Sequence, residues 1–319
     1  MIIRFRSFNM DPYVILPEEE YPTLLEELKK QLPASLMAYY PLMLSQKNLF
    51  KKFKFVLVDE WPQFNCILEV ENLPEDLSPH RVYGYCRREE FCVVLNQMIS
   101  QRLQKSTSSI LLFGGPRRMK EILSMSGDED AHSATVSTLK CYGSKKIQDT
   151  KPSWAGGFDT FRVSKHTLKK IEVPSPFIAT TIKREYMDLI LSQWQYTGSY
   201  CDAKEFFTHT ATTFESVCIL NESGEPVAWG FEQHYGAIGM IHVLPEYRRR
   251  KLGSAVVSLL SEKILRKDDF VYSAIETGNT KSIILHKQLG YEEVEVYPEC
   301  IFTWFYYENE KKRVDESIQ

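Results

Sequence analysis

The stretch from residue 237 to residue 290 constrains the fold and chemistry of this chain more than any other part of the sequence. Its apolar periodicity and turn signals predict, in order, a strand over 237–244, a basic loop over 248–253, a helix over 254–265, a strand over 271–275 and a short helix over 282–289. Gly290 follows the last helix, where a left-handed glycine commonly ends a helix. This order places a basic, glycine-containing loop at the beginning of a helix.

The basic loop contains Arg248, Arg249, Arg250 and Lys251, and Gly253 follows closely. The first backbone N–H groups of a helix have no acceptor within the helix, and the helix dipole is positive at that end. We therefore expect an anion such as a pyrophosphate to bind there, because the four cations add to the field and Gly253 lets the backbone approach a ligand. A solvated run of charges is the alternative interpretation.

The remaining elements divide the chain into two halves. In the second half the patterns predict helices near 181–196 and 202–212, a hairpin of strands over 216–221 and 226–233, and a final strand over 300–306. In the first half they predict a helix that begins near residue 19 and ends at Pro33, strands over 53–59, 65–70 and 109–113, and a helix over 88–105. Residues 124–160 show little periodicity and are predicted to be loops that link the halves.

Composition excludes several classes of protein. The 319 residues include 39 Lys and Arg against 42 Asp and Glu, and a net charge of −3 argues against a broad nucleic-acid-binding surface. No apolar run is long enough to predict a membrane-spanning helix. The seven cysteines are scattered and contain no C-x-x-C pair, which favours reduced thiols over a disulfide framework or a zinc site. The first residues make a weak targeting peptide.

Two motifs carry a resemblance to a known superfamily. Residues 243–255, VLPEYRRRKLGSA, resemble the acyl-CoA signature R/Q-x-x-G-x-G/A of GNAT acyltransferases. Residues 279–291, NTKSIILHKQLGY, resemble the later N-x-x-[AS]-x-x-L-Y-x-K-x-G-F segment of that superfamily. The motifs occur in the expected order, with the expected helix and strand between them. The resemblance implies acetyl-CoA or another acyl-CoA as co-substrate, and no metal.

A more specific similarity extends into both halves of the chain. Residues 28–36 (LKKQLPASL), 56–65 (VLVDEWPQFN) and 218–229 (CILNESGEPVAW) resemble segments of the glycine N-acyltransferase family. That family implies an α/β (α+β) fold of tandem GNAT-like domains, each with a mixed, mostly antiparallel central sheet flanked by helices. By this resemblance, residues 1–160 form a domain without a CoA site and residues 161–319 form the catalytic domain that binds acyl-CoA. The implied reaction is acyl transfer to the amino group of glycine or a similar small amine.

The resemblance also assigns residues to the donor site. The predicted acyl-CoA-binding residues are Ile241, Val243, Arg248, Arg249, Arg250, Lys251, Gly253, Ser254, Asn279 and Ser282. Lys251 stands where the GNAT signature has its first glycine. Its backbone N–H can still face a phosphate if its φ and ψ are ordinary, so we expect CoA binding to persist.

The proton acceptor is harder to assign. The general base that the family implies is a glutamate, and the matching position here is Ala237, which cannot accept a proton. His242 is predicted to face the same side of its strand as Met240 and Leu244. Glu232 and His234 are two residues apart, on or just after the preceding strand, and are predicted to face one way. An amine that attacks a thioester must first lose a proton, so His242 and Glu232 are the predicted candidates for this role, with a water relay or unassisted attack as alternatives.

Two further groups complete the predicted chemistry. Parted strands would let the backbone N–H of Met240 or Ile241 polarise the thioester oxygen. His286 stands where many GNAT members have a tyrosine that protonates the leaving thiolate, and an imidazole can do this near neutral pH. A packing role for His286 is the alternative.

Other functions stay open at this stage. The acceptor is predicted to be a small-molecule amine or amino acid, but an arylalkylamine or a protein lysine would suit the same fold. A degenerate CoA-binding protein without turnover is the third hypothesis, and Ala237 favours it. No nucleic-acid or membrane partner is expected. The location is expected to be the cytoplasm, with mitochondria as the alternative because the resembled family acts largely there.

Overall fold

The computed structural model describes residues 13–46, 54–71, 80–91, 94–95, 97–98, 110–113, 152–194, 203–294 and 301–305. Its strands are β1 (Val14–Leu16), β2 (Lys54–Val58), β3 (Cys66–Glu71), β4 (His80–Cys86), β5 (Ile110–Phe113), β6 (Pro152–Ser164), β7 (Ile178–Thr180), β8 (Ser216–Leu220), β9 (Pro226–Glu232), β10 (Ala237–Val243), β11 (Phe270–Glu276), β12 (Glu292–Glu293) and β13 (Ile301–Phe305). Its longer helices are α1 (Tyr21–Lys29), α2 (Leu36–Ser45), α6 (Met187–Ser192), α7 (Ala203–Thr213), α8 (Leu252–Ile264) and α9 (Thr280–Gln288).

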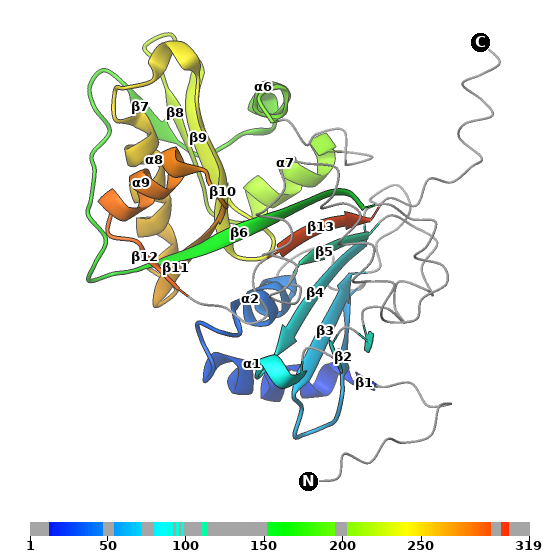
Figure 1. Ribbon diagram of the computed structural model, residues 1–319. Helices are drawn as coiled ribbons and strands as arrows, with labels where there is room; N and C mark the ends of the chain where they lie inside the picture. The colour runs from blue at the N-terminus through cyan, green and yellow to red at the C-terminus, as the bar shows by residue number, and fades with distance from the viewer. Residues whose placement is uncertain are drawn as a thin grey trace, which may run out of the picture.

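The described strands form one continuous sheet. Its order is β1-β2-β3-β4-β5-β13-β6-β11-β10-β9-β8-β7, and β12 pairs with β6 beside this path. Neighbouring strands are antiparallel except for β4 with β5 and β10 with β11, which are parallel. The predicted fold class is therefore confirmed, since each half is a mixed, mostly antiparallel sheet flanked by helices (Figure 1).

Strand β6 connects the two halves. Its first part, 152–157, pairs with β13, and its second part, 158–164, pairs with β11. Strand β13 comes from the end of the described chain, yet it lies between β5 and β6 (Figure 1). The prediction of loops was wrong for residues 152–160, because Pro152, Gly156 and Gly157 hide a strand that its two neighbours stabilise. The domain boundary at residues 160 and 161 stays a prediction.

Several other elements agree with their predicted positions. Strands β2, β3, β5, β8, β9, β10, β11 and β13 and helices α7, α8 and α9 lie within a few residues of the predicted ranges. Strands β4 and β7 were not predicted, and the helix expected over 88–105 falls largely outside the described residues. Gly290 has a φ of 93° and ends α9 as expected.

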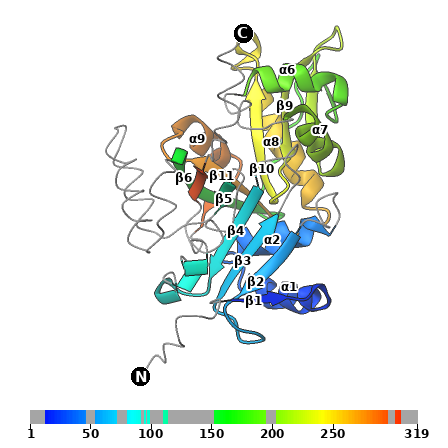
Figure 2. The same ribbon diagram turned by 90° about the vertical axis from the view of Figure 1, so that its right-hand side faces the viewer.

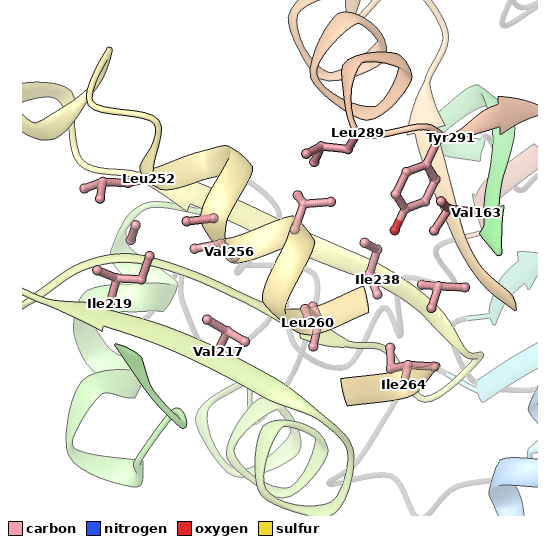
Figure 3. Packing of buried hydrophobic residues seen from close by; sticks show 14 of the residues in the cluster. Val163, Val217, Ile219, Ile238, Leu252, Val256, Leu260, Ile264, Leu289 and Tyr291 are labelled. Carbon is pink, nitrogen blue, oxygen red and sulfur yellow. The ribbon is translucent and has the colours of Figure 1, made fainter. Parts of the chain in front are cut away.

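Alternating side chains of β8 and β9 hold helices on both faces of the second half. Val217 and Ile219 pack against α8, in a cluster that includes Leu252, Val256, Leu260 and Ile264 (Figure 3). Cys218 and Trp229 point the other way and pack with residues of α6 and α7. Because successive residues of a strand face opposite sides, this pattern fixes α8 on one face and α6 with α7 on the other.

Helix α2 brings the first half against the second. Its Tyr40 is buried in one cluster with Tyr83 of β4, Ala237 of β10 and Tyr272 of β11. The Tyr40 ring lies over the turn before β10, where a Cβ on Gly236 would come within 2.8 Å of it. Figure 2 shows α2 beside the end of the sheet at which β10 begins. The start of β10 is thus covered by the first half.

A buried network of charged side chains lies in the first half. Lys54 Nζ on β2 is 2.9 Å from Glu69 Oε2 and 3.3 Å from Glu71 Oε1, and Arg81 Nη1 is 3.1 Å from Glu71 Oε2. Lys54 also donates to the carbonyl oxygen of Pro41, inside α2. All four charged side chains are at most 1% exposed. The network therefore fixes α2 on the sheet. As a separate finding, no helix in the described part of the chain has the length and apolar character to cross a membrane.

Candidate functional site

Strand β10 parts from β11 in the middle of the sheet. Their parallel pairing consists of Ala237 with Tyr272 and Ile238 with Ser273, and ends there. On the other side, the register with β9 shifts between Gly239 and His242, and Met240 has a φ of 51°. Residues 239–243 are partly exposed although they belong to an inner strand. The bulge and the separation therefore open the backbone of β10 to a ligand.

A cavity of about 990 Å³ continues from this opening. It is bounded by the end of β10, the basic loop, the first turn of α8 and one side of α9. The residues that line it are Ile241, His242, Val243, Tyr247, Arg248, Arg249, Lys251, Leu252, Gly253, Ser254, Asn279, Lys281, Ser282, Ile284, Leu285, His286 and Gln288. The structure thus brings eleven of the thirteen predicted site residues together in one cavity.

Sequence reasoning missed six of these lining residues. Lys281, Ile284, Leu285 and Gln288 share one side of α9 by their spacing of three and four residues. That spacing was a usable signal, because Asn279, Ser282 and His286 had already placed α9 at the site. Tyr247 and Leu252 flank the basic loop and complete the set.

The first turn of α8 is arranged as an anion site. Its first intrahelical bond runs from Ala255 N–H to the carbonyl oxygen of Lys251, so the N–H groups of the three residues between have no acceptor within the helix. Those three residues, Leu252, Gly253 and Ser254, all line the cavity. Free N–H groups and the positive helix end together suit a phosphate.

Lys251 adopts the backbone conformation that favours glycine. Its φ is 61°, and Arg249 has a φ of 65°. The condition of ordinary dihedral angles, under which the Lys251 N–H would face a phosphate, is therefore not met. The conformation explains why the GNAT signature has glycine at this position, since a side chain there is strained by about 1–2 kcal/mol.

We expect Lys251→Gly to raise the free energy of unfolding by about 1 kcal/mol, because glycine removes this strain. Arg250→Gly is the matched control, because Arg250 is in the same loop but lacks a positive φ. There glycine only adds chain entropy and is expected to destabilise the protein by about 0.5–1 kcal/mol. Urea unfolding of both variants measures the difference. Equal losses of stability in the two variants would contradict the strain at Lys251.

Glu232 and Arg250 do not line the cavity. Glu232 is 6% exposed and accepts a hydrogen bond from the Glu215 N–H at 3.2 Å. Burial is the main cause that raises its pKa to about 7. His234 is also buried, close to Tyr83 and Phe206, and burial and then Arg81 and Lys54 hold its pKa well below the usual range.

The raised pKa of Glu232 predicts a pH-dependent stability. A carboxyl whose pKa rises from 4.5 to about 7 on folding stabilises the protein fully below pH 4.5 and loses that contribution as pH rises through 7. Glu232→Gln mimics the protonated form, so we expect it to be more stable than wild type by about 3 kcal/mol at pH 8 and little different at pH 5. Urea unfolding across this range measures it; a difference independent of pH would contradict the shift.

His286 lies at the edge of the cavity as a neutral imidazole. Its Nδ1 is 2.9 Å from the carbonyl oxygen of Ser282, an acceptor, so Nδ1 must carry the proton. Burial lowers the pKa of His286 to about 4. Its Nε2 therefore has a lone pair and no proton near neutral pH. This arrangement suits acceptance of a hydrogen bond and argues against His286 as the acid for a leaving thiolate.

His242 combines the properties that a proton acceptor needs. Its ring is stacked on Trp229, with centroids 5.1 Å apart and an interplanar angle of 18°. Burial and then Arg248 lower its pKa, which keeps the ring neutral at physiological pH. His242 lines the cavity, and its Nε2 is buried without a hydrogen-bond partner among the described residues.

Asn279 and Ser282 form the beginning of α9. The Asn279 side chain accepts the Ser282 N–H at 3.2 Å and so caps the helix. Both residues also line the cavity. The capped end of α9 therefore forms one side of the cavity.

Ala237, which stands where the family resemblance implies a glutamate base, is buried outside the cavity. Ala237 is 1% exposed and packs with Tyr40, Tyr83 and Tyr272. It lies before the opening of the sheet, while His242 lies beyond it. Ala237 is not among the residues that line the cavity.

Comparisons with known proteins give the families that this chain is similar to. Residues 217–299 match the model of the FR47-like protein family. The chain is 26% identical to a rat glycine N-acyltransferase-like protein, Keg1, over 75% of this chain and 81% of that protein. It is 24% identical to human glycine N-acyltransferase over 80% of this chain and 86% of that enzyme. The predicted resemblance to the glycine N-acyltransferase family is confirmed.

One solved structure shares the fold over nearly the whole chain. It is an X-ray structure of a Drosophila protein from a structural genomics consortium, with a TM-score of 0.71 and 17% sequence identity. The similarity covers 93% of this chain and 98% of the other. The arrangement of both halves around one sheet therefore recurs in a second protein.

Proposed function

We propose that this chain is an acyl-CoA-dependent N-acyltransferase that acts on the amino group of glycine or a similar small amine. The observation that carries the proposal is the cavity that joins the first turn of α8 to the opened strand β10. An anion site at one end and an accessible strand backbone at the other suit a long ligand with a phosphate group and a reactive carbonyl. Its similarity to named glycine N-acyltransferases supports the same reaction.

The lining residues divide by chemistry along the cavity. The N–H groups of Leu252, Gly253 and Ser254 would hold the pyrophosphate of the donor, with Arg248 and Arg249 adding positive charge. Ile241 and Val243 would lie along its extended arm. The donor supplies a thioester carbonyl, and the backbone N–H groups of the bulge at Met240 and Ile241 are the candidates to polarise its oxygen.

We assign His242 as the proton acceptor. An α-amino group is mostly protonated at neutral pH and must become neutral before it attacks. The lone pair of His242 can take this proton, since the ring is neutral and lies at the bulge. We do not assign this role to Glu232, because it is buried and does not line the cavity.

The test is thiol release from acetyl-CoA and benzoyl-CoA with a panel of amino acids and arylalkylamines. Gly253→Trp is the variant, since a Cβ there already comes within 3.3 Å of Leu285 and 3.5 Å of Val243. An indole would fill the space in front of the first turn of α8. Glu222→Trp is the control, because Glu222 lies in the exposed turn between β8 and β9.

We expect acceptor-dependent thiol release by wild type and Glu222→Trp. Gly253→Trp is expected to lose release together with CoA binding, measured by calorimetry at equilibrium. Release that persists in Gly253→Trp would place the donor elsewhere and overturn the assignment. The acceptors that support release would identify the substrate class.

A second function is favoured by Ala237. A chain without the family's glutamate could bind CoA as a sensor and not transfer its acyl group. CoA binding that is lost in Gly253→Trp, combined with no thiol release for any acceptor, would support this reading. Turnover by wild type would exclude it.

A further inference from the structure

The donor cavity has a positive charge that a pyrophosphate alone does not balance. Its lining includes Arg248, Arg249, Lys251 and Lys281, and none of the described lining residues is Asp or Glu. None of these cations forms an ion pair with a carboxylate among the residues that the structure describes. A pyrophosphate linked at both ends has one negative charge on each phosphate, which leaves part of the positive charge unbalanced. The cavity therefore suits a ligand with a further anionic group.

Lys281 is the cation that lies apart from the basic loop. The other three precede α8, so their charges add to the field at its first turn. Lys281 belongs instead to the first turn of α9 and is exposed. Lys287, on the same helix, is 3.8 Å from a carboxylate oxygen of Glu293 and does not line the cavity. Of these two lysines of α9, Lys281 is thus the one whose charge is open to a ligand in the cavity.

Lys281 lies near the first turn of α8. A Cβ on Gly253 would come within 3.3 Å of Leu285 Cδ1, so the two helices meet at that point. Lys281 is four residues before Leu285, which places both on one side of α9 and about 6 Å apart along its axis. An anion bound by Lys281 would therefore be a close neighbour of an anion bound by the first turn of α8.

The donor that the proposed function requires has two neighbouring groups of this kind. Its pyrophosphate is attached to the 5′ position of a ribose, and a phosphomonoester is attached to the 3′ position of the same ring. The ring holds the two groups near each other. A phosphomonoester has about two negative charges at neutral pH, which suits the compact charge of a lysine ammonium.

We propose that Lys281 binds the 3′-phosphate of the donor, so that the site prefers coenzyme A to a donor that lacks this group. This inference rests on the proposed function for the nature of the ligand. The ammonium donates hydrogen bonds to the phosphate oxygens, and charge-assisted bonds of this kind are stronger than neutral ones. A donor without the phosphate leaves Lys281 in water, so the preference comes from the lost attraction.

The test measures the affinities of CoA and 3′-dephospho-CoA by calorimetry at equilibrium, with no acceptor present. Wild type is expected to bind CoA about tenfold more tightly, at the lower end of the range for hydrogen bonds to charged groups, because Lys281 is exposed. Lys281→Met removes the ammonium and keeps the unbranched shape of the side chain. Its affinity for CoA is expected to fall about tenfold, while its affinity for dephospho-CoA stays within about twofold.

Lys287→Met is the matched control. It removes the same charge from the same helix, at a residue outside the cavity lining, and is expected to keep the wild-type preference. Lys281→Arg keeps the charge and is expected to keep the preference as well. An equal loss of affinity for both ligands in Lys281→Met would overturn the proposal, because Lys281 would then act on a group that the two ligands share.

Salt dependence gives an independent measurement. Added NaCl is expected to weaken the binding of CoA to wild type more steeply than that of dephospho-CoA, because it screens an additional exposed charge pair. In Lys281→Met the two slopes are expected to be equal. Equal slopes in wild type would contradict the proposal.

Failure of this proposal and failure of the proposed function give different results. A selective loss of CoA affinity in Lys281→Met, combined with no thiol release for any acceptor, supports the phosphate site and counts against acyl transfer. Thiol release by wild type, combined with equal affinities for CoA and dephospho-CoA, supports acyl transfer and overturns the role of Lys281. A wild type that binds neither ligand overturns both.

Discussion

Replacing His242 with glutamine is expected to lower kcat about 10²–10⁴-fold, which is the usual contribution of a positioned proton acceptor. Glutamine fills the space against Trp229 and cannot take a proton from the amine. Because burial and Arg248 lower the pKa of His242, wild-type activity is expected to fall only as pH drops below the usual range of histidine titration. The variant should lose this acidic limb in a pH profile of thiol release.

The control for this experiment is His166→Gln, on an exposed histidine far along the chain from the bulge. CoA affinity is expected to stay unchanged in both variants, because His242 is assigned to the acceptor and not to the phosphate site. A His242→Gln enzyme with kcat within threefold of wild type would refute the assignment. Added imidazole should restore part of the activity of His242→Ala, since the smaller residue leaves room for it.

Lys54→Met is expected to lower the free energy of unfolding by about 3–5 kcal/mol. The variant removes the cation that lies within 3.3 Å of both Glu69 and Glu71 and leaves their carboxylates buried. Burial already raises the pKa of Glu69 to about 7, even though Lys54 acts to lower it. Without Lys54 we expect Glu69 to take up a proton at neutral pH, so the loss should be smaller at pH 6 than at pH 8.

Lys30→Met provides the comparison for Lys54. Lys30 forms an ion pair of 2.6 Å with Glu27, but its side chain is 66% exposed. Water screens such a pair, so its removal should cost at most about 1 kcal/mol. Urea unfolding of both variants at pH 6 and pH 8 measures the contrast. Similar losses in the two variants would mean that the buried network contributes no more than a surface pair.

The motif-bearing part of the fold was predictable from sequence because its patterns are local. The sequence of α8 repeats apolar residues at helical spacing, and the strands before and after it in the chain are short apolar runs. Strand β6 was missed because two adjacent glycines and a proline obscure it, and its strand conformation depends on β11 and β13, which are distant in sequence. Most of the cavity lining was predicted, since the basic loop and Asn279 belong to two recognisable motifs.

The chemical states of the site residues could not be predicted in the same way. Glu232 and His242 lie on neighbouring strands, and only the three-dimensional arrangement shows that one is buried away from the cavity and the other lines it. The proton on His286 Nδ1 depends on a hydrogen bond to Ser282. The left-handed conformation of Lys251 occurs at the entry into α8, and a lysine does not itself indicate it, although the glycine of the GNAT signature at this position does.

The place of β13 has a consequence for how the chain is assembled during synthesis. Residues 110–113 and 152–157 each lack the sheet neighbour that lies between them until residues 301–305 are made, because that neighbour is β13. Until then β5 presents an open edge, and an open edge invites pairing with other chains. A ribosome that stalls before residue 301 would therefore release a product whose first half is unfinished, and separately expressed halves would each lack a neighbour strand.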